Sequence, residues 1–258
     1  MSPSALITGA TDGHGRRVAL DLARQGWTVV VHGRDRRRAE EVAREAGDRA
    51  HVALADLSSL GAARGLADEV LDRLGSVDVL VNNAGIIARR RRESDDGIEL
   101  TFAVNYLAHV VLTDAMLDAA PPRRIVNVSS LAAAPLDPAD PMLERGYEAY
   151  RAYAQSKLAQ VLWTFDLAER LDAARTTANA LHPATLMDTT MVRAAFGGSR
   201  STVQDGAEAT ERLVLDPALD GVTGRFFDGR AEARAHPSAY DPEARRRLRE
   251  LTAGLLAR

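Results

Sequence analysis

Residues 4–15 read SALITGATDGHG, a short apolar strand that runs directly into a glycine-rich loop. An amphipathic stretch follows, with apolar residues at helical spacing. A strand, a glycine loop and a helix in this order direct backbone N–H groups and the positive helix end at a phosphate. Gly9 would allow a tight turn, Gly13 would let the backbone approach a pyrophosphate, and Gly15 would let the helix pack on the strand. The alternative is a glycine-rich turn with no chemical role, which would not require this context on both sides.

The next strand, expected over 27–32, ends in Gly33, Arg34 and Asp35. An acidic residue at the end of a second strand would accept the ribose 2′-hydroxyl of NAD. Arg34 instead offers a guanidinium that can form paired hydrogen bonds with a 2′-phosphate, and Gly33 leaves room for that group. We therefore expect NADP as the cofactor, with NAD as the alternative because Asp35 weakens the preference. Arg34 could also simply begin a solvated charged run over 34–38.

Two further strands end in polar residues. The strand expected over 50–59 places Asp56 and Leu57 near its carboxyl end, where an adenine could meet a carboxylate and a backbone amide. Equally, Asp56, Ser58 or Ser59 could simply cap the helix that follows. The strand over 77–85 closes with two asparagines and a glycine, and adjacent amides at a strand end need hydrogen-bond partners. We expect a polar ligand or a polar link between strands at that point.

Lys157 is the only lysine among the 33 basic residues, and Tyr153 stands four residues before it. Residues i and i+4 project from the same face of a helix. Because a neighbouring ammonium favours the phenolate, we expect Lys157 to lower the pKa of Tyr153 from its usual value of about 10. Such a phenol could donate and accept a proton near neutral pH. Taken alone, this Tyr–Lys spacing is also met on ordinary solvated helix faces.

Strands and helices alternate along the chain, which predicts one α/β domain over 1–258 with a parallel sheet covered on both faces. A ligand then binds beyond the carboxyl ends of the strands, where strand order reverses. A long helix is expected over 96–119, and Asn105 within it needs a partner because asparagine disfavours an apolar helix. The last strand is expected over 222–227.

Three segments are expected to shape a substrate site. Residues 131–152 begin with a proline-rich stretch that cannot form one regular element. Residues 187–201 belong to a flexible-looking loop with clustered threonines, and the tail over 228–258 contains a charged helix. None of the three has a readable chemical signature, so a moderately apolar small molecule is the only expectation for the substrate.

The overall composition excludes several classes of function. The net charge of −3 and the pI near 6.1 give no global attraction to nucleic acid or to an anionic membrane. The absence of cysteine excludes disulfides and thiolate nucleophiles, and the six scattered histidines predict no metal site. No apolar run approaches the roughly 20 residues of a membrane span, and no signal peptide is recognised. The basic run 89-RRRR-92 is followed by acidic residues and is expected to be a solvated loop. We expect a cytoplasmic protein.

With these motifs placed, the sequence resembles the short-chain dehydrogenase/reductase family over nearly its whole length. The resemblance rests on 8-TGATDGHG-15, 82-NNAG-85, Asn105, Ser130 closing 125-IVNVSS-130, and 153-YAQSK-157, in the expected order. The stretches 95–113 and 153–171 further resemble the branch of retinol-dehydrogenase-like and protochlorophyllide-reductase-like enzymes. The family implies a Rossmann-like, doubly wound parallel sheet of seven strands with helices on both faces. It also implies homodimers or homotetramers built on the two long helices, and an apolar stripe past Lys157 suits such an interface or a core.

The resemblance implies roles for the catalytic residues. Tyr153 would be the general acid/base, and Ser130 would hydrogen-bond the same substrate oxygen. Lys157 would hold the nicotinamide ribose and lower the pKa of the phenol. Asn105 would bind a water in a proton relay to solvent. Ser129 is expected to be structural, because family members place the catalytic serine at the second position.

The resemblance also implies the residues around the cofactor. They are Gly9, Thr11, Asp12, His14, Gly15, Asn83, Ala84 and Gly85. Asp12 stands where NADP-preferring relatives often have a basic residue, so that Arg34 would carry the preference alone. His14 replaces a usually aliphatic residue beside the nicotinamide. Leu186 is expected to be the backbone partner of the carboxamide. Thr189 is expected to contact the cofactor phosphates, although it stands one position later in the sequence than the corresponding threonine of the family pattern.

Together these residues predict an NADP-preferring oxidoreductase that interconverts a carbonyl and an alcohol by hydride transfer. One alternative is an NAD-dependent alcohol dehydrogenase of the same family. The other is a non-catalytic sensor that binds a dinucleotide without turnover. Such a sensor would be expected to lose Tyr153 or Lys157, and this chain keeps both.

Overall fold

The computed structural model describes residues 2–257, which form one α/β domain around an eight-stranded sheet. The strands are β1 (Ser4–Ile7), β2 (Thr28–Gly33), β3 (Ala50–Leu54), β4 (Val79–Asn82), β5 (Arg124–Val128), β6 (Thr177–His182), β7 (Phe226–Asp228) and β8 (Ala231–Ala233). Their order in the sheet is β3-β2-β1-β4-β5-β6-β7-β8, and every neighbouring pair except β7 and β8 is parallel. Strand order reverses between β1 and β4, which places the expected ligand crevice beyond their carboxyl ends.

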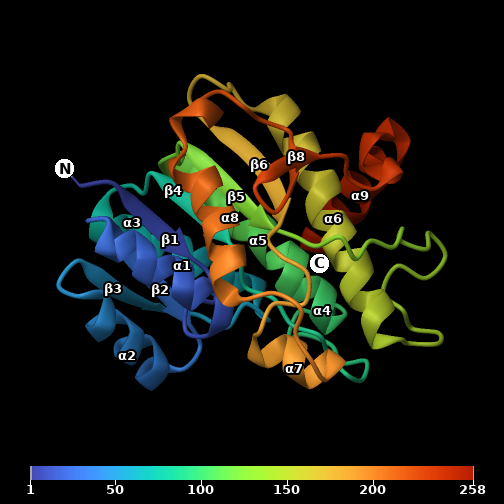
Figure 1. Cartoon of the computed structure of the whole chain (residues 1–258). Coiled ribbons are helices and arrows are strands. Elements are labelled where there is room, and N and C mark those ends of the chain that lie inside the picture. Colours follow the sequence, from blue (N-terminus) through green and yellow to red (C-terminus); the bar gives the residue numbers. More distant parts are fainter. Residues whose placement is uncertain (1, 258) are drawn as a thin grey trace.

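Helices cover both faces of the sheet (Figure 1). They are α1 (Gly13–Arg24), α2 (Arg36–Ala46), α3 (Leu60–Leu74), α4 (Leu100–Phe102), α5 (Ala108–Ala119), α6 (Ala149–Arg170), α7 (Thr190–Phe196), α8 (Val203–Leu215) and α9 (Pro242–Leu256). Helices α1, α2 and α8 pack on one face, and α3, α5 and α6 pack on the other. The central strands are therefore buried on both sides, which explains why they read as continuous apolar runs.

The predicted fold is confirmed, with an addition at one edge of the sheet. Strands β1 to β7 are the seven expected parallel strands, but β7 begins at Phe226, later than the range expected over 222–227. The eighth strand, β8, was not predicted. It has the sequence Ala-Glu-Ala, which has low strand propensity, and it forms by antiparallel pairing with β7.

The expected helix over 96–119 begins at Leu100, because the Glu99 carboxylate caps it by accepting from the N–H groups of Thr101 and Phe102. A π-helical turn then interrupts it over Ala103–Leu107, where each hydrogen bond spans one extra residue. The span Leu100–Ala119 is long and apolar enough to cross a membrane, contrary to the expectation that no apolar run has that length. In the fold 83% of it is buried, as the core helix of a folded domain would be.

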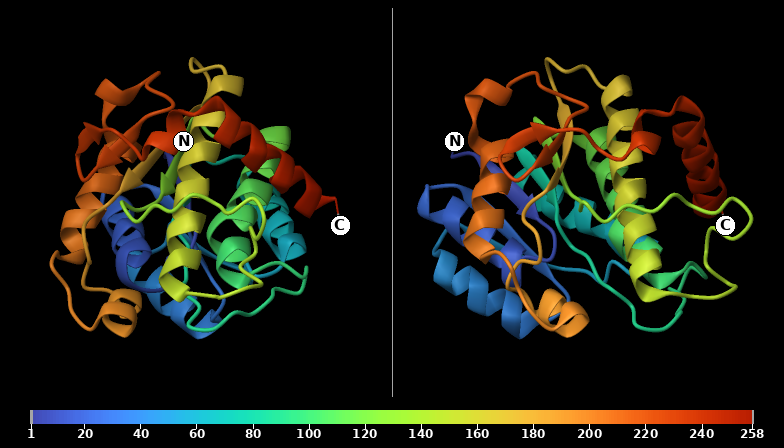
Figure 2. Two further views of the ribbon diagram at one scale, coloured as in Figure 1. Left: turned by 90° about the vertical axis from the view of Figure 1, so that its right-hand side faces the viewer. Right: turned by 45° about the vertical axis from the view of Figure 1, so that its right-hand side comes forward.

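The apolar stripe of α6 lies in the core of the chain. Helix α9 lies alongside α6 (Figure 2) and buries Leu248 and Leu255 in the same cluster as Leu158 and Leu162. Arg245 of α9 reaches the carboxylate of Glu169 at the end of α6. Of the two uses that the sequence left open for this stripe, the structure therefore assigns it to the core.

Candidate active site

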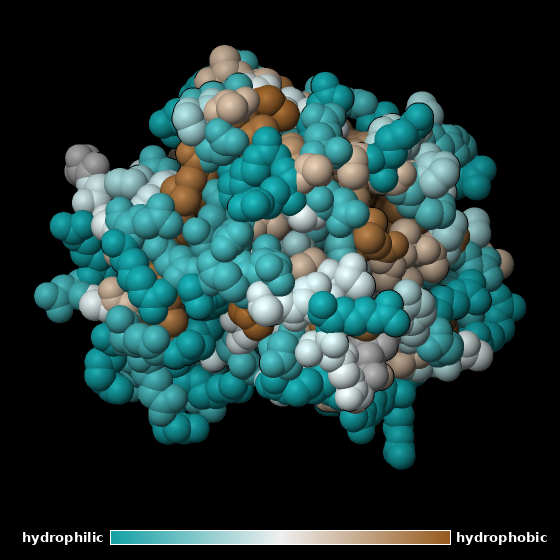
Figure 3. Space-filling model, in the orientation of Figure 1, coloured by the Kyte–Doolittle hydropathy of each residue, from teal (hydrophilic) through white to brown (hydrophobic). Residues whose placement is uncertain are grey.

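A cavity of about 890 Å³ opens at the carboxyl ends of β1, β4, β5 and β6. Its volume lies near the upper end of the range of about 300–1,000 Å³ that is typical of ligand and cofactor sites. Every site residue predicted from the sequence lines this cavity, with the one exception of Asn105. The surface over α2 at one side is almost entirely hydrophilic, whereas apolar and intermediate residues gather toward the middle of the same face (Figure 3). The cavity lining itself includes the charged residues Arg34 and Asp56 and the apolar residues Ile87 and Met191.

The glycine loop after β1 is shaped by close backbone approach. Gly9 has φ +64°, and a Cβ there would lie 2.9 Å from Cα of Ala84, so only glycine fits. Gly33 has a further reason besides the one expected, because a Cβ there would lie 2.3 Å from Cγ2 of Thr11. Gly33 therefore seats Thr11 in the loop as well as leaving room at the end of β2.

His32 supports the same loop and was not predicted to do so. Its Nδ1 accepts from the N–H of Gly9 at 3.1 Å, and its Nε2 donates to the carbonyl oxygen of Ala55 at 3.1 Å. Burial lowers the pKa of His32 to about 4, so the ring is neutral and can hold one donor and one acceptor role. The sequence feature that could have indicated this role is a histidine at the end of an otherwise apolar strand.

The two adjacent asparagines at the end of β4, Asn82 and Asn83, have different roles. Asn82 donates to Oδ1 of Asn127 at 2.8 Å, which is a polar link between β4 and β5. Asn83 donates to the carbonyl oxygen of Thr8 at 2.7 Å, and the hydroxyl of Thr8 accepts from the N–H groups of Asn83 and Ala84. The polar link expected between strands is therefore present, and it fixes the floor of the cavity.

Two arginine–carboxylate pairs mark the charged end of the cavity. Arg34 lies 3.6 Å from Asp56, and Arg38 lies 3.2 Å from Asp12. Burial alone would raise the pKa of Asp12, but hydrogen bonds from Thr190 and from the Gly13 N–H, together with the Arg38 guanidinium, lower it below its usual value. Asp56 also accepts from the N–H of Ser58 in a turn, but it does not cap the next helix, because the N-cap of α3 is Ser59, whose hydroxyl accepts from the N–H of Ala62. Arg38 was not among the predicted residues.

The segment after β6 forms the outer wall. Leu186 has φ +48°, a left-handed conformation that non-glycine residues rarely adopt and that concentrates at ligand-clamping positions. The hydroxyl of Thr189 accepts from the N–H of Val192 and so caps α7, a helix within the stretch expected to be a loop. A Cβ added at Gly13 would lie 3.0 Å from Cγ2 of Thr189, so the wall closes against the glycine loop.

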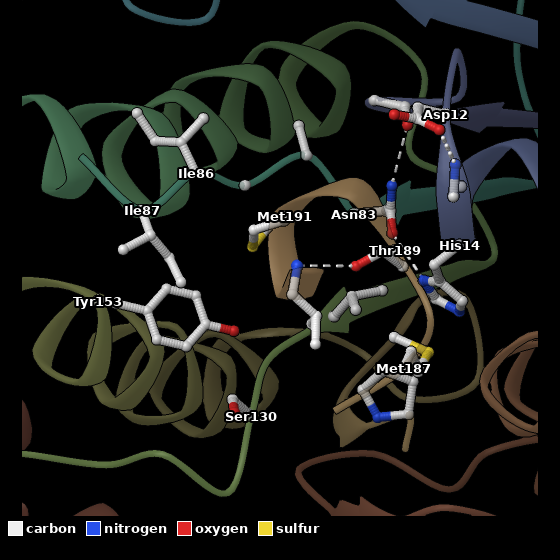
Figure 4. Close-up of a pocket in the computed structure, with 18 of the residues that line it drawn as sticks. Asp12, His14, Asn83, Ile86, Ile87, Ser130, Tyr153, Met187, Thr189 and Met191 are labelled. Atoms are coloured by element: carbon white, nitrogen blue, oxygen red, sulfur yellow. Dashed lines mark hydrogen bonds between the residues drawn. The ribbon is translucent and has the colours of Figure 1, made fainter. Parts of the chain in front are cut away.

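At the other end, the side chains of Ser130 and Tyr153 face the cavity close together (Figure 4). Burial raises the pKa of Tyr153 to about 12, and the hydrogen bond with Ser130 only partly offsets that rise. The expectation that Lys157 lowers this pKa is wrong for this arrangement. Nζ of Lys157 lies 5.7 Å from the centroid of the Tyr153 ring, so that desolvation dominates.

Two protein oxygens accept hydrogen bonds from the Lys157 side chain. Its Nζ donates to the carbonyl oxygen of Val128 at 2.8 Å and to Oε1 of Gln160 at 2.9 Å. Only 4% of Lys157 is exposed, and burial lowers its pKa to about 7. Ser129 donates to the carbonyl oxygen of Lys157 at 2.7 Å, which is the structural role expected for the first of the two serines.

Asn105 lies just behind the cavity, in the π-helical turn. Its Oδ1 accepts from the N–H of Ile86 at 2.8 Å, and its Nδ2 donates to Oγ of Ser156 at 3.0 Å. The carbonyl oxygen of Asn105 accepts from Nδ1 of His109 at 3.0 Å. Asn105 therefore ties the strand-end loop to α6, and its expected role in a water relay stays a prediction.

Apolar residues that the sequence did not single out surround Tyr153. Figure 4 shows Ile86, Ile87 and Met191 around the cavity near its ring, and Leu131 and Val192 also line the cavity. They come from two loops and from helix α7, which are separate in the sequence, so no local sequence pattern links them. A substrate that meets Ser130 and Tyr153 would contact these apolar groups.

The same residues fit a nicotinamide dinucleotide. The first-turn N–H groups of α1 have no partner within the helix and point toward the cavity end where phosphates would lie. The Ser130–Tyr153–Lys157 group lies at the opposite end, where a reacting ring would meet a substrate. The long cavity with two chemically different ends matches the two ends of such a cofactor.

Comparisons with known proteins agree with this geometry. The family model described as short chain dehydrogenase matches residues 3–198. The chain is 36% identical to retinol dehydrogenase 13 of Mus musculus, over 95% of this chain and 81% of that protein. It is 38% identical to polyprenol dehydrogenase of Mus musculus, again over 95% of this chain and 81% of the relative.

Solved structures give the same result. A crystal structure of an uncharacterised protein from Mycobacterium paratuberculosis superposes with a TM-score of 0.81 at 31% identity, covering 98% of this chain and 92% of that one. A short-chain dehydrogenase from Burkholderia cenocepacia in complex with NADP has a TM-score of 0.70 at 29% identity, covering 88% and 95% of the two chains. A 3-ketoacyl-(acyl-carrier-protein) reductase from Brucella melitensis complexed with NADH has a TM-score of 0.71 at 28% identity, covering 88% and 98%. This chain belongs to the short-chain dehydrogenase/reductase family of NAD(P)-dependent enzymes, in its retinol-dehydrogenase-like branch.

Proposed function

We propose that this enzyme prefers NADP and interconverts a carbonyl and an alcohol on a small, moderately apolar substrate. The observation that carries the proposal is the pair of hydroxyls of Ser130 and Tyr153, which share one wall of the cavity next to Lys157. The bound nicotinamide supplies the hydride, and the protein supplies orientation and proton transfer.

The roles of the side chains follow from their protonation states. With a pKa of about 12, Tyr153 carries its proton at neutral pH and can donate it to a carbonyl oxygen. The hydroxyl of Ser130 donates a hydrogen bond to the same oxygen, where negative charge develops. Lys157, on the next turn of α6, lines the same part of the cavity and would hold the nicotinamide ribose beside these groups.

The preference for NADP is supported by the charged end of the cavity. Arg34 lines the cavity and Arg38 pairs with Asp12, which also lines it, and both arginines are exposed and paired with single carboxylates. Exposed pairs of this kind are worth only about 0–1 kcal/mol, so a doubly charged 2′-phosphate can compete with Asp56 and Asp12 for them. The guanidinium of Arg38 also offsets the negative charge of Asp12, which stands where NADP-preferring relatives often have a basic residue.

A carbonyl panel tests the activity. The purified enzyme, supplied with NADPH or NADH, should reduce aldehydes or ketones with apolar groups, and Tyr153→Phe should abolish this turnover. Tyr150→Phe is the matched control, because Tyr150 lines the same cavity three residues earlier on α6 and should leave turnover in place. Full activity of Tyr153→Phe on an accepted substrate would contradict the mechanism. Dinucleotide binding without turnover across the panel would favour a sensor instead.

A further inference from the structure

His14 is a buried histidine inside the glycine loop, at the start of α1, with only 6% of its surface exposed. Its Nδ1 lies 2.8 Å from Oδ1 of Asn83, and its Nε2 lies 3.0 Å from Oγ1 of Thr210 on α8. The imidazole therefore bridges two elements far apart in the sequence, the strand-end loop after β4 and helix α8. An aliphatic side chain at this position could fill the space but could make neither bond.

Both nitrogens of His14 have hydrogen-bond partners. Asn83 donates its Nδ2 hydrogens to the carbonyl oxygens of Thr8 and Gly9, so its Oδ1 is the atom that faces Nδ1 of the imidazole. Nε2 faces the hydroxyl of Thr210 and the carbonyl oxygen of Gly206. Oδ1 of Asn83 and the Gly206 oxygen can only accept, whereas the Thr210 hydroxyl can donate or accept, so the ring has a partner at each end in either neutral tautomer. Burial lowers the pKa of His14, which favours the neutral ring.

The wall of the cavity packs against the same part of α8. The carbonyl oxygen of Gly206 lies 3.1 Å from Nε2 of His14, so the helix backbone lies directly against the ring. A Cβ added at Gly206 would lie 2.2 Å from Sδ of Met187, 3.3 Å from the His14 ring and 3.4 Å from Cβ of Pro183. His14, Gly206 and Met187 are therefore packed without spare room. Any shift of α8 relative to the glycine loop would also move the wall segment 183–189.

We propose that His14 is a positioning residue that locks the glycine loop, Asn83 and the wall segment 183–189 into one unit, and thereby sets the affinity for the dinucleotide. The inference requires only that a nicotinamide dinucleotide occupies this cavity, and it is independent of NADP preference and of the substrate. His14 acts through Asn83 and α8 on the shape of the site. Its effect is therefore the same for both dinucleotides, because it does not lie at the Arg34 end.

Four variants separate positioning from simple packing. His14→Leu removes both bonds at similar volume, whereas His14→Asn can keep a donor toward Asn83 and His14→Gln can keep a polar group toward α8. Thr210→Val removes the α8 partner with almost no change in shape and does not touch the cavity. His51→Leu, on β3 and outside the cavity, is the matched control. Dissociation constants for NADPH and NADH are measured by calorimetry, together with the melting temperature without dinucleotide, kcat and KM.

We expect His14→Leu to weaken the binding of NADPH and NADH equally, by about tenfold, and to raise the KM for the dinucleotide by a larger factor than it lowers kcat. Thr210→Val should weaken both by about threefold, and the double variant should bind no more weakly than His14→Leu. His14→Asn and His14→Gln should each restore part of the loss. A folded His14→Leu with unchanged dissociation constants would overturn the proposal. If His14→Leu does not fold, unchanged binding in Thr210→Val would overturn it and weakened binding would support it. Absent turnover would contradict the proposed function but leave these binding results intact.

Discussion

The two ends of the cavity are held by different kinds of interaction. At the charged end, Arg34–Asp56 and Arg38–Asp12 are exposed ion pairs at 3.6 and 3.2 Å. At the catalytic end, Lys157 is almost fully buried and has short hydrogen bonds to protein oxygens. Exposed pairs contribute about 0–1 kcal/mol, whereas a buried polar group left without its partner costs about 1–3 kcal/mol. The charged end can therefore change its ligand preference at little cost in stability, and the catalytic end cannot change so freely.

The largest expected effect is at the catalytic end. Lys157→Met replaces the buried amine with an apolar chain of similar length, and turnover should fall by about 10²- to 10⁴-fold, because the group that would hold the nicotinamide beside Tyr153 is lost. Relief of the desolvation cost and loss of a donor for Val128 and Gln160 oppose each other, so the melting temperature should change by only a few degrees. Arg151→Met, an exposed position on the same helix, should change neither quantity. Turnover within tenfold of wild type in Lys157→Met would remove the contrast between the two ends.

The pH dependence of alcohol oxidation tests the raised pKa of Tyr153. Oxidation needs the phenolate as base, and below a pKa of about 12 the phenolate fraction grows tenfold for each pH unit. We expect kcat/KM for an accepted alcohol to keep rising through pH 9 without a plateau. A plateau between pH 6 and 8 would instead support a phenol pKa lowered by Lys157.

At the charged end, Arg34→Ala and Arg38→Ala should each weaken NADPH binding by about 10- to 100-fold, from the loss of charge-assisted hydrogen bonds to the 2′-phosphate. NADH binding and the melting temperature should stay nearly constant, because both arginines are exposed. Arg36→Ala, which lies on α2 together with Arg38 and is paired with Glu40, is the control. Titration calorimetry measures the dissociation constants for both dinucleotides. An equal loss of affinity for NADPH and NADH would show that these arginines do not select between the two.

The smallest expected effect is on stability below neutral pH. Burial lowers the pKa of His32 to about 4 and that of His109 to about 3, while the unfolded chain binds these protons near pH 6.5. The unfolded state is therefore favoured as the pH falls below 6.5, and the loss of stability continues down to the folded pKa values. Between pH 7.5 and 5.5 each histidine should lower the free energy of unfolding by about 1.3 kcal/mol. Urea denaturation at the two pH values measures this, and an unchanged midpoint would contradict it.

Much of this fold could be predicted because its signals are local. Buried parallel strands are continuous apolar runs, and the glycine loop after β1 has the spacing that close backbone approach requires. The sequence also placed Ser130, Tyr153 and Lys157 correctly in one cavity, because each follows or lies on a recognisable element.

The rest depended on contacts between distant segments. The π-helical turn at Ala103–Leu107 leaves no trace in the apolar pattern, and β8 exists only because β7 offers it an edge. The pKa of Tyr153 was predicted in the wrong direction because the i, i+4 spacing gives proximity, whereas burial and the oxygens that hold Lys157 depend on the tertiary fold. Arg38 was overlooked because its partner, Asp12, lies in the glycine loop, far from Arg38 in the sequence.

Lys157 is the only lysine in the sequence and is almost completely buried, so its accessibility to a protease reports local unfolding of the chain. A lysine-specific protease has one target bond, between Lys157 and Leu158 in the middle of α6, and that bond is protected while the helix remains packed. Cleavage into two fragments would therefore measure how often this part of the molecule unfolds, and added dinucleotide should slow it in proportion to the stability gained on binding.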